Sequence, residues 1–259
     1  MPPAVTLERS LWTLNVLASI LVVWRLYSIH VHHRYRFFFA SMLLALARSA
    51  ALFPFDPKTE TYYRIWASTQ PLVWLFYVLV ISELYSLVLR QYRGIYSLSR
   101  WFFFGATAAS VVISALTVIP TIATTPHRRW LLYSYVLVER ELVTSLAVFL
   151  LLLLALVAWF PVPLSRNLLT HCCVYSAYFF AGNVVFLYWH VGGIAATRLS
   201  SIAKLSTALI CLFCWVFLLS SAAEKRSAVI FLGRNPLEEK RLLDYLESLN
   251  ATLLRTAGK

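Results

Sequence analysis

The sequence predicts an all-α membrane protein, in which a seven-transmembrane helix bundle precedes a short amphipathic C-terminal helix. Three observations support this fold class. The 259 residues are 60% hydrophobic, with a mean hydropathy of +0.72. Only 13% are charged, whereas soluble domains average about 25%. The apolar residues also lie in long blocks, and a soluble domain built this way would expose large apolar patches and aggregate.

Seven blocks reach the length of about 20 residues that a helix needs to cross a bilayer. The predicted spans are roughly 11–28, 37–54, 66–89, 101–122, 131–160, 168–190 and 200–220. Short turn-forming segments separate them, such as "FPFDPKTE" after the second span and "VGG" after the sixth. Helices are expected because lipid offers no hydrogen-bond partner to an unpaired backbone group. Residues 1–222 therefore form the predicted transmembrane domain, and residues 223–259 form a tail.

The orientation of the spans is predicted from the distribution of Lys and Arg, which favour cytoplasmic segments. The start "MPPAVTLERSLW" has neither a basic n-region nor a small-residue cleavage site, so we expect the first span to be retained. With the N-terminus outside and the C-terminus in the cytoplasm, the inside segments hold twice as many basic residues as the outside segments. That excess comes entirely from the tail. The expected location is the bacterial cytoplasmic (inner) membrane.

The tail contains a predicted amphipathic helix at about 235–256. Asn235 is a suitable N-cap, Pro236 fits the first helical position, and acidic residues follow in the first turn. The helix has one apolar stripe, which consists of Leu242, Leu246, Leu249 and Leu253. This stripe fits packing against the inner leaflet or the bundle. It also fits self-association or a protein partner, although it is short for a coiled coil.

Charged and titratable side chains inside membrane spans are expensive and mark function by default. The candidate residues for a ligand-binding site or an intramembrane polar network are Arg48, Glu83, Glu139, Arg140, Glu141 and His171. Arg48 lies about 9 Å from the outer end of its span, and Glu139 about 12 Å from the outer end of span five. The matched depths predict a pair between Arg48 and Glu139 or Glu141. Only one of these glutamates can face Arg48, because residues two apart point about 200° apart on a helix.

The triplet Glu139–Arg140–Glu141 has a second interpretation. Block 131–160 is about 45 Å long as a helix, whereas the hydrocarbon core is about 30 Å thick. Residues 142–160 carry no charge and can cross alone, which would leave the triplet among the lipid headgroups. The alternative is a polar pocket in the outer half of the membrane, shared with Arg48. The sequence leaves open whether these charges form a helix clamp or a binding pocket.

Glu83 and His171 are predicted to lie at similar depths near the inner ends of their spans. A contact of Glu83 with His171, or with Arg90 on the same helix face, would be structural. A proton-sensing or ligand-binding role is the functional alternative.

No enzyme, cofactor or metal site is predicted from the motifs. His30, His32 and His33 fit an interfacial basic turn better than a metal site, because no second cluster of ligands accompanies them. Cys172, Cys173, Cys211 and Cys214 fall inside spans, where core packing is the simpler interpretation. The chain has no H-E-x-x-H, G-x-S-x-G, P-loop or dinucleotide-binding motif. Its net charge of +12 lies mostly at the ends of apolar blocks, which indicates lipid headgroups rather than nucleic acid.

Two stretches carry a resemblance to known proteins. "SELYSLVLRQYRGI" after the third span and "LESLNATLLR" near the end resemble an uncharacterised family of stand-alone bacterial seven-transmembrane proteins. The architecture distantly resembles the seven-helix sensory input modules of bacterial histidine kinases. The resemblance implies a seven-helix fold and assigns no activity. A sensory module would continue into an output domain where this chain stops at Lys259, so we expect output through a partner.

The expected function is therefore that of a non-enzymatic, sensor- or receptor-like membrane protein with a polar pocket in its outer half. A small transporter or permease component is the first alternative. Only Pro71 and Pro120 interrupt the predicted spans, and seven spans do not divide into two equal repeats, which disfavours transport. A structural scaffold subunit, in which the charges only hold helices together, is the second alternative.

Overall fold

The computed structural model describes most of the chain. The described ranges are 3–56, 59–89, 127–159, 164–225 and 227–228, with the shorter pieces 96, 101, 103–105, 107–109, 112, 244, 247–248 and 250–252. The predicted span 101–122 and the predicted tail helix 235–256 lie, for most of their length, outside these residues.

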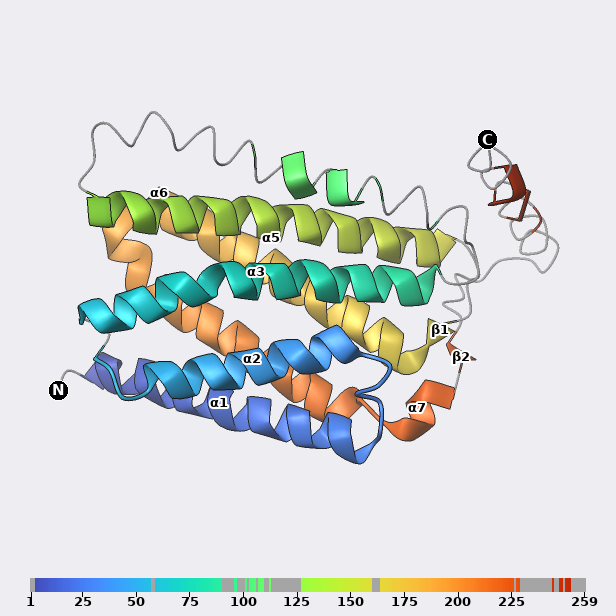
Figure 1. Ribbon diagram of the computed structural model, residues 1–259, viewed down its shortest axis with the longest axis horizontal. Coiled ribbons are helices and arrows are strands. Elements are labelled where there is room, and N and C mark those ends of the chain that lie inside the picture. The colour runs from blue at the N-terminus through green and yellow to red at the C-terminus, as the bar shows by residue number, and fades with distance from the viewer. Residues whose placement is uncertain are drawn as a thin grey trace. The chain divides into compact units, whose positions relative to one another are not determined.

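The described chain is built from long helices (Figure 1). They are α1 (Pro3–Ser28), α2 (Arg36–Leu52), α3 (Glu60–Val88), α5 (His127–Trp159), α6 (Arg166–Leu218) and the short α7 (Ser221–Lys225). The strands β1 (Leu164–Ser165) and β2 (Ser227–Ala228) have two residues each and pair with one another. The predicted helical class is confirmed, and several helices begin earlier than the apolar blocks because polar residues extend them.

Five stretches are long and apolar enough to cross a membrane. They are Leu7–Ser28, Glu60–Val88, Ser134–Trp159, Arg166–Gly193 and Ala196–Leu218. Helix α2 has 17 residues and is therefore about 26 Å long, slightly less than the hydrocarbon core. The described residues thus show five of the seven predicted spans.

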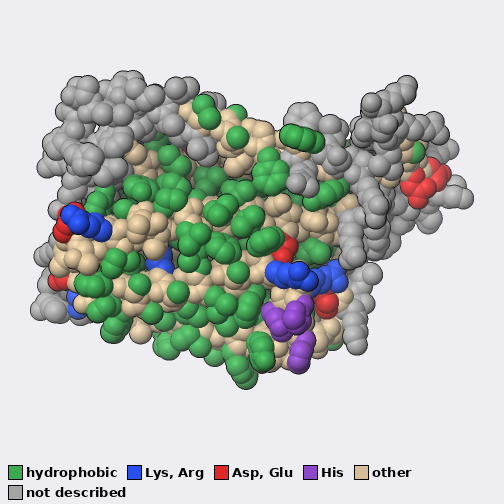
Figure 2. Space-filling model, in the orientation of Figure 1, with side chains coloured by type: hydrophobic (Ala, Val, Ile, Leu, Met, Phe, Trp, Pro, Cys, Tyr) green, Lys and Arg blue, Asp and Glu red, His purple; other side chains and the backbone are tan. Residues whose placement is uncertain are grey.

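These helices are apolar on their exposed surfaces as well as where they contact one another. Within each of the five stretches, only 17% to 39% of the most apolar segment is buried inside the protein. Large side chains such as Trp24, Phe180 and Phe217 are exposed, and hydrophobic side chains cover much of the described surface in Figure 2. Such a surface is expensive in water and matches hydrocarbon. This is the pattern of a membrane-embedded protein.

Helix α6 reverses direction at Gly193, so that its two halves form a helical hairpin (Figure 1). Gly193 has φ 58° and ψ −140°, a region that side chains with a Cβ rarely adopt. A Cβ on Gly192 would lie 2.6 Å from the Cβ of Ala196. Two contacts bridge the turn: Trp189 Nε1 donates to Thr197 Oγ1 at 3.2 Å, and the Lys204 ammonium lies 3.8 Å from the centroid of the Phe186 ring.

The chain divides into two compact units, which we describe separately. Unit 1 comprises Met1–Glu83 and Ser165–Arg226, and unit 2 comprises Leu84–Leu164 and Ser227–Lys259. The core of unit 1 includes the fully buried side chains of Leu26, Tyr35, Phe38 and Phe179. In unit 2, the rings of Tyr85 and Phe149 each pack against Phe103 at centroid distances of 5.9 and 4.9 Å.

The Gly193→Ala substitution should destabilise the protein, because it forces an alanine into a positive φ. We expect a loss of about 1–2 kcal/mol in unfolding free energy, measured by denaturant unfolding of the purified protein in detergent. Gly105→Ala is the matched control. Gly105 lies in a helical segment, and a Cβ there would have no heavy atom within 4 Å, so alanine should be neutral or stabilising. Equal unfolding curves for the two variants would contradict the role of Gly193.

Candidate functional site

The carboxylate of Glu83 caps the N-terminus of α2. Its Oε1 and Oε2 atoms accept hydrogen bonds from the Phe37 N–H at 3.2 and 3.1 Å, and Oε2 also accepts from the Phe38 N–H at 3.3 Å. The first N–H groups of a helix have no partner within the helix and carry partial positive charge. Glu83, from α3, therefore binds α2 to α3 through charge-assisted bonds.

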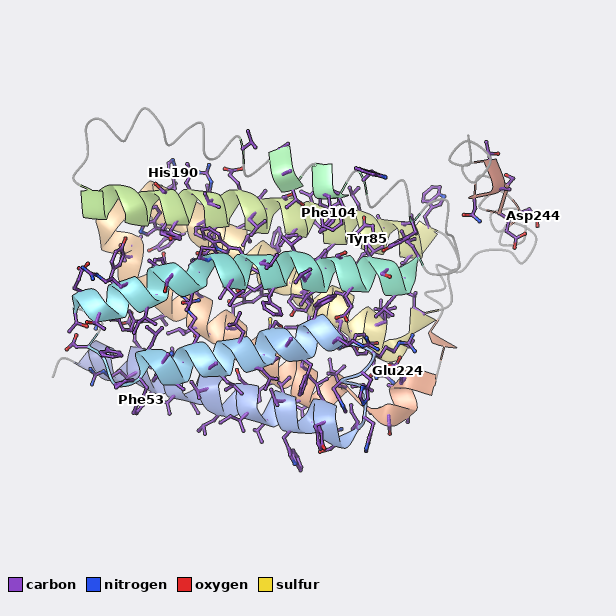
Figure 3. All side chains as sticks on the ribbon, viewed as in Figure 1. Phe53, Tyr85, Phe104, His190, Glu224 and Asp244 are labelled. Carbon is purple, nitrogen blue, oxygen red and sulfur yellow. The ribbon has the colours of Figure 1, made fainter. Side chains whose placement is uncertain are left out.

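Glu224 in α7 lies at the centre of a polar network that draws on three segments of unit 1 (Figure 3). Its Oε1 pairs with the Arg34 guanidinium at 2.8 Å. Its Oε2 accepts from the Tyr35 hydroxyl at 3.2 Å and from Asn167 Nδ2 at 2.8 Å. The Glu224 side chain is 15% exposed and that of Arg34 is 44% exposed, so the network lies at the edge of the core. A carboxylate in this position needs several donors to offset its lost hydration.

The Tyr35 hydroxyl is held in its neutral form by its surroundings. Burial raises the pKa of Tyr35 well above its ordinary value, and the negative charge of Glu224 raises it further. The hydroxyl therefore remains protonated at neutral pH and can donate to Glu224.

Asn167 joins the two ends of the α6 hairpin. Its side chain is fully buried, and its Nδ2 donates to the Ser220 carbonyl at 2.9 Å while its Oδ1 accepts from the Ser220 N–H at 3.2 Å. The Arg25 guanidinium, from α1, donates to the Leu219 carbonyl at 3.0 Å. A cation at a helix C-terminus is favourable because of the helix dipole. The end of α6 is thus fixed both to its own beginning and to α1.

His171 is buried in a cage of aromatic rings one turn along α6 from Asn167. Its centroid lies 4.4 Å from that of Tyr35, 4.6 Å from Phe38 and 6.2 Å from Trp215. Its side chain is 0% exposed. Neither ring nitrogen has a hydrogen-bond partner within the described part of the chain, so the structure places no Glu83 carboxylate against it. Arg90, the other predicted contact of Glu83, lies outside the described residues.

Arg48 is half-buried between α2 and α3 within unit 1. Its guanidinium donates to Gln70 Oε1 at 2.7 Å and lies 5.9 Å from the Trp66 ring centroid. Gln70 is itself buried. The amide oxygen and the aromatic face both offer a guanidinium favourable contacts. The predicted pairing of Arg48 with Glu139 or Glu141 remains a prediction.

The triplet lies on α5 near the start of the apolar stretch Ser134–Trp159. Arg140 Nε donates to Glu141 Oε1 at 3.0 Å, and the same two side chains form an ion pair. Glu139 is half-buried. The apolar stretch has 26 residues, about 39 Å of helix, and therefore exceeds the hydrocarbon core by enough to leave the triplet near headgroup level. Both interpretations of the triplet remain open.

Several residues of this site were not anticipated from the sequence. Glu224 is close to the predicted boundary between the transmembrane domain and the tail, and Arg34, Tyr35 and Asn167 lie beside span ends, where polar residues are ordinary. One signal was available: Asn167, His171 and Tyr175 recur at intervals of four residues, which places them on one face of a helix.

No metal centre is formed by the residues that the structure describes, since no group of three His, Cys, Asp or Glu side chains is placed to hold an ion. The rings of His32 and His33 are 4.0 Å apart in the connection between α1 and α2, and the four cysteines are free thiols. The chemistry of the site is hydrogen bonding between helix ends and buried side chains.

Comparison with known proteins found no matching family model, no matching curated protein and no matching solved structure. The resemblance to bacterial seven-helix proteins therefore remains a prediction from the sequence.

The Glu83→Gln substitution tests the cap on α2. We expect the variant to lose about 1–3 kcal/mol of unfolding free energy, because a neutral amide accepts more weakly and loses the favourable charge at the helix N-terminus. The measurement is denaturant unfolding in detergent. Glu60→Gln is the control, since Glu60 forms an exposed i,i+4 pair with Arg64 and should contribute less than about 0.5 kcal/mol. Equal stabilities for the two variants would show that the Glu83 cap does not contribute measurably to the free energy of unfolding.

Proposed function

We propose that this chain is a seven-helix integral membrane protein that acts as a non-enzymatic sensor or receptor and signals through a protein partner. Its location would be the bacterial cytoplasmic membrane, with the N-terminus outside and the C-terminus in the cytoplasm. The five apolar stretches and the exposed apolar side chains support the membrane part of this proposal. The cytoplasmic tail would be the output element.

The observation that carries the proposal is the network of Glu224. This residue lies in α7, at the point where the chain leaves the helices and enters the tail. Its partners come from the connection between α1 and α2 and from the start of α6. A change in the relative position of those helices would alter the contacts of Glu224, and hence the base of the tail. A sensor that signals through a protein partner needs such a connection between its helices and its output element.

The ligand site of the proposed sensor is the predicted polar pocket in the outer half of the membrane, which includes Arg48. The guanidinium of Arg48 is oriented by Gln70 and Trp66, which fits recognition of a small organic anion. The Arg48 contacts also fit a helix clamp, in which case no ligand binds.

A specific observation favours a second function, that of a structural scaffold subunit. Glu83 caps α2 from α3, and Arg25 from α1 binds the carbonyl of Leu219, the residue that follows α6. These charged groups hold helices together and are engaged within the protein. A small transporter or permease component is the remaining alternative, and it would require solute movement by the purified protein.

Substitution of Glu224 should separate these functions. We expect full-length protein purified from native membranes to carry a stoichiometric partner, and Glu224→Gln to reduce the amount of that partner severalfold. The reason is that the neutral Gln side chain cannot form the ion pair with Arg34, so the start of the tail is held less firmly to the helices. Co-purification followed by mass spectrometry is the measurement, and Glu60→Gln is the control that should retain the partner.

Each other outcome identifies a different function. A partner retained equally by Glu224→Gln and by wild type would favour the scaffold. Solute movement by the purified protein in liposomes, with no partner, would favour the transporter and contradict the proposal.

The Arg48→Ala variant tests the proposed ligand site. We expect at least one small carboxylate in a panel of organic anions to raise the melting temperature of the wild type, and Arg48→Ala to abolish that shift. Arg64→Ala, which removes an exposed arginine of α3, should keep it. If Arg48→Ala leaves folding, expression and the thermal shift unchanged, Arg48 is not part of a ligand site.

A further inference from the structure

An apolar groove runs between the first half of α1 and the second half of α2. Its volume is about 350 Å³. The lining includes Trp12, Val16 and Ile20 from α1, Leu46 and Ala50 from α2, and Phe53, which directly follows α2. The rings of Trp12 and Phe53 stack at 5.8 Å across one end, and Figure 3 shows Phe53 at that end of α2. The small side chain of Ala50 and its neighbour Ser49 leave the space open between these larger groups.

The groove lies along an apolar stretch of α1. Its α1 residues lie within the stretch Leu7–Ser28, which is long and apolar enough to cross a bilayer. Trp12 and Phe53 mark its outer end in the predicted orientation, as aromatic residues do at the boundary between headgroups and hydrocarbon. A second copy of the chain would have to insert a helix, which is about 10 Å wide. A groove of about 350 Å³ is closer in size to an acyl chain.

A basic residue continues the groove toward the headgroups. Arg9 lies three residues before Trp12 and four before Thr13, so all three share one side of α1, and Thr13 Oγ1 donates to the Arg9 carbonyl at 2.9 Å. Arg9 is exposed. From Arg9 to Ile20 the helix rises about 16 Å, which matches the roughly 15 Å depth of one leaflet. A phosphate at Arg9 and an acyl chain along the groove would therefore be in register.

We propose that this groove is a binding site for one phospholipid of the outer leaflet, with an acyl chain between α1 and α2 and the headgroup phosphate at Arg9. Acidic residues accompany Arg9 at this level: Glu8 adjoins it, and Asp56 lies three residues after Phe53. A rim with both signs of charge favours a zwitterionic headgroup over a strongly anionic one. The lipid would join α1 to α2 at the end opposite to the Glu83 cap.

The test uses the full-length protein, stripped of lipid in detergent and mixed with dioleoyl phosphatidylethanolamine, and measures bound lipid by native mass spectrometry. We expect one tightly bound lipid on the wild type. Ala50→Trp should fill the groove and lose that lipid. Ala47→Trp is the matched control, because Ala47 is exposed one turn earlier on α2 and does not line the groove. Ser49→Leu is a smaller filling variant that gives the same readout if Ala50→Trp does not fold.

The headgroup is tested separately. Dioleoylglycerol, which lacks the phosphate, should bind the wild type more weakly than the phospholipid, and Arg9→Gln should remove that difference. Arg198→Gln, an exposed arginine just after the α6 turn, should preserve it. Equal lipid binding by the Ala50→Trp and Ala47→Trp variants would overturn the site. If the wild type forms a dimer that Ala50→Trp abolishes, the groove binds a second copy of the chain instead of a lipid. If Arg9→Gln has no effect, Arg9 does not bind the headgroup phosphate.

Discussion

Helix ends surrounded by apolar side chains must have their N–H and C=O groups satisfied, and this constraint organises the part of unit 1 where α1 ends and α2 begins. Neither lipid nor a packed core supplies water to these groups. The start of α2 is satisfied by the Glu83 carboxylate, and the carbonyl of Leu219, the residue that follows α6, by the Arg25 guanidinium. Asn167 and Ser220 then close the α6 hairpin on itself. The positions of four helices therefore depend on a few side chains that carry polar groups to the ends of other helices.

The same chemistry limits what the buried charges can do. The Glu83 carboxylate is engaged by two backbone N–H groups, those of Phe37 and Phe38. Glu224 differs, because its partners come from separate segments and its edge reaches solvent. It is therefore the better candidate for a contact that forms and breaks. His171 differs again, since a fully buried imidazole with unsatisfied nitrogens in the described structure adds rigidity through its aromatic neighbours alone.

Contacts on the apolar outer surface would also help to hold the helices in position. In the most apolar segment of each of the five stretches, 17% to 39% of the residues are buried inside the protein, so much of each segment is available for contact with lipid. The groove between α1 and α2 occurs where the small side chains of Ser49 and Ala50 leave space between larger side chains. An acyl chain there would restore the van der Waals contacts that the helices lack. Polar caps at one end of the α1–α2 pair and a lipid at the other would together fix their relative position.

The sequence alone determined the helical class, the membrane-type composition and the approximate positions of the apolar helices, because length and hydrophobicity are local properties of a segment. It also identified Arg48, Glu83 and His171 as unusual, since a charged or titratable residue inside an apolar block is visible without coordinates. It did not reveal that Glu83 would bind the N–H groups of Phe37 and Phe38, or that Glu224 would join Arg34, Tyr35 and Asn167. Only the tertiary structure decided those partners, because a cap depends on which helix ends converge in space, and no local pattern records that convergence.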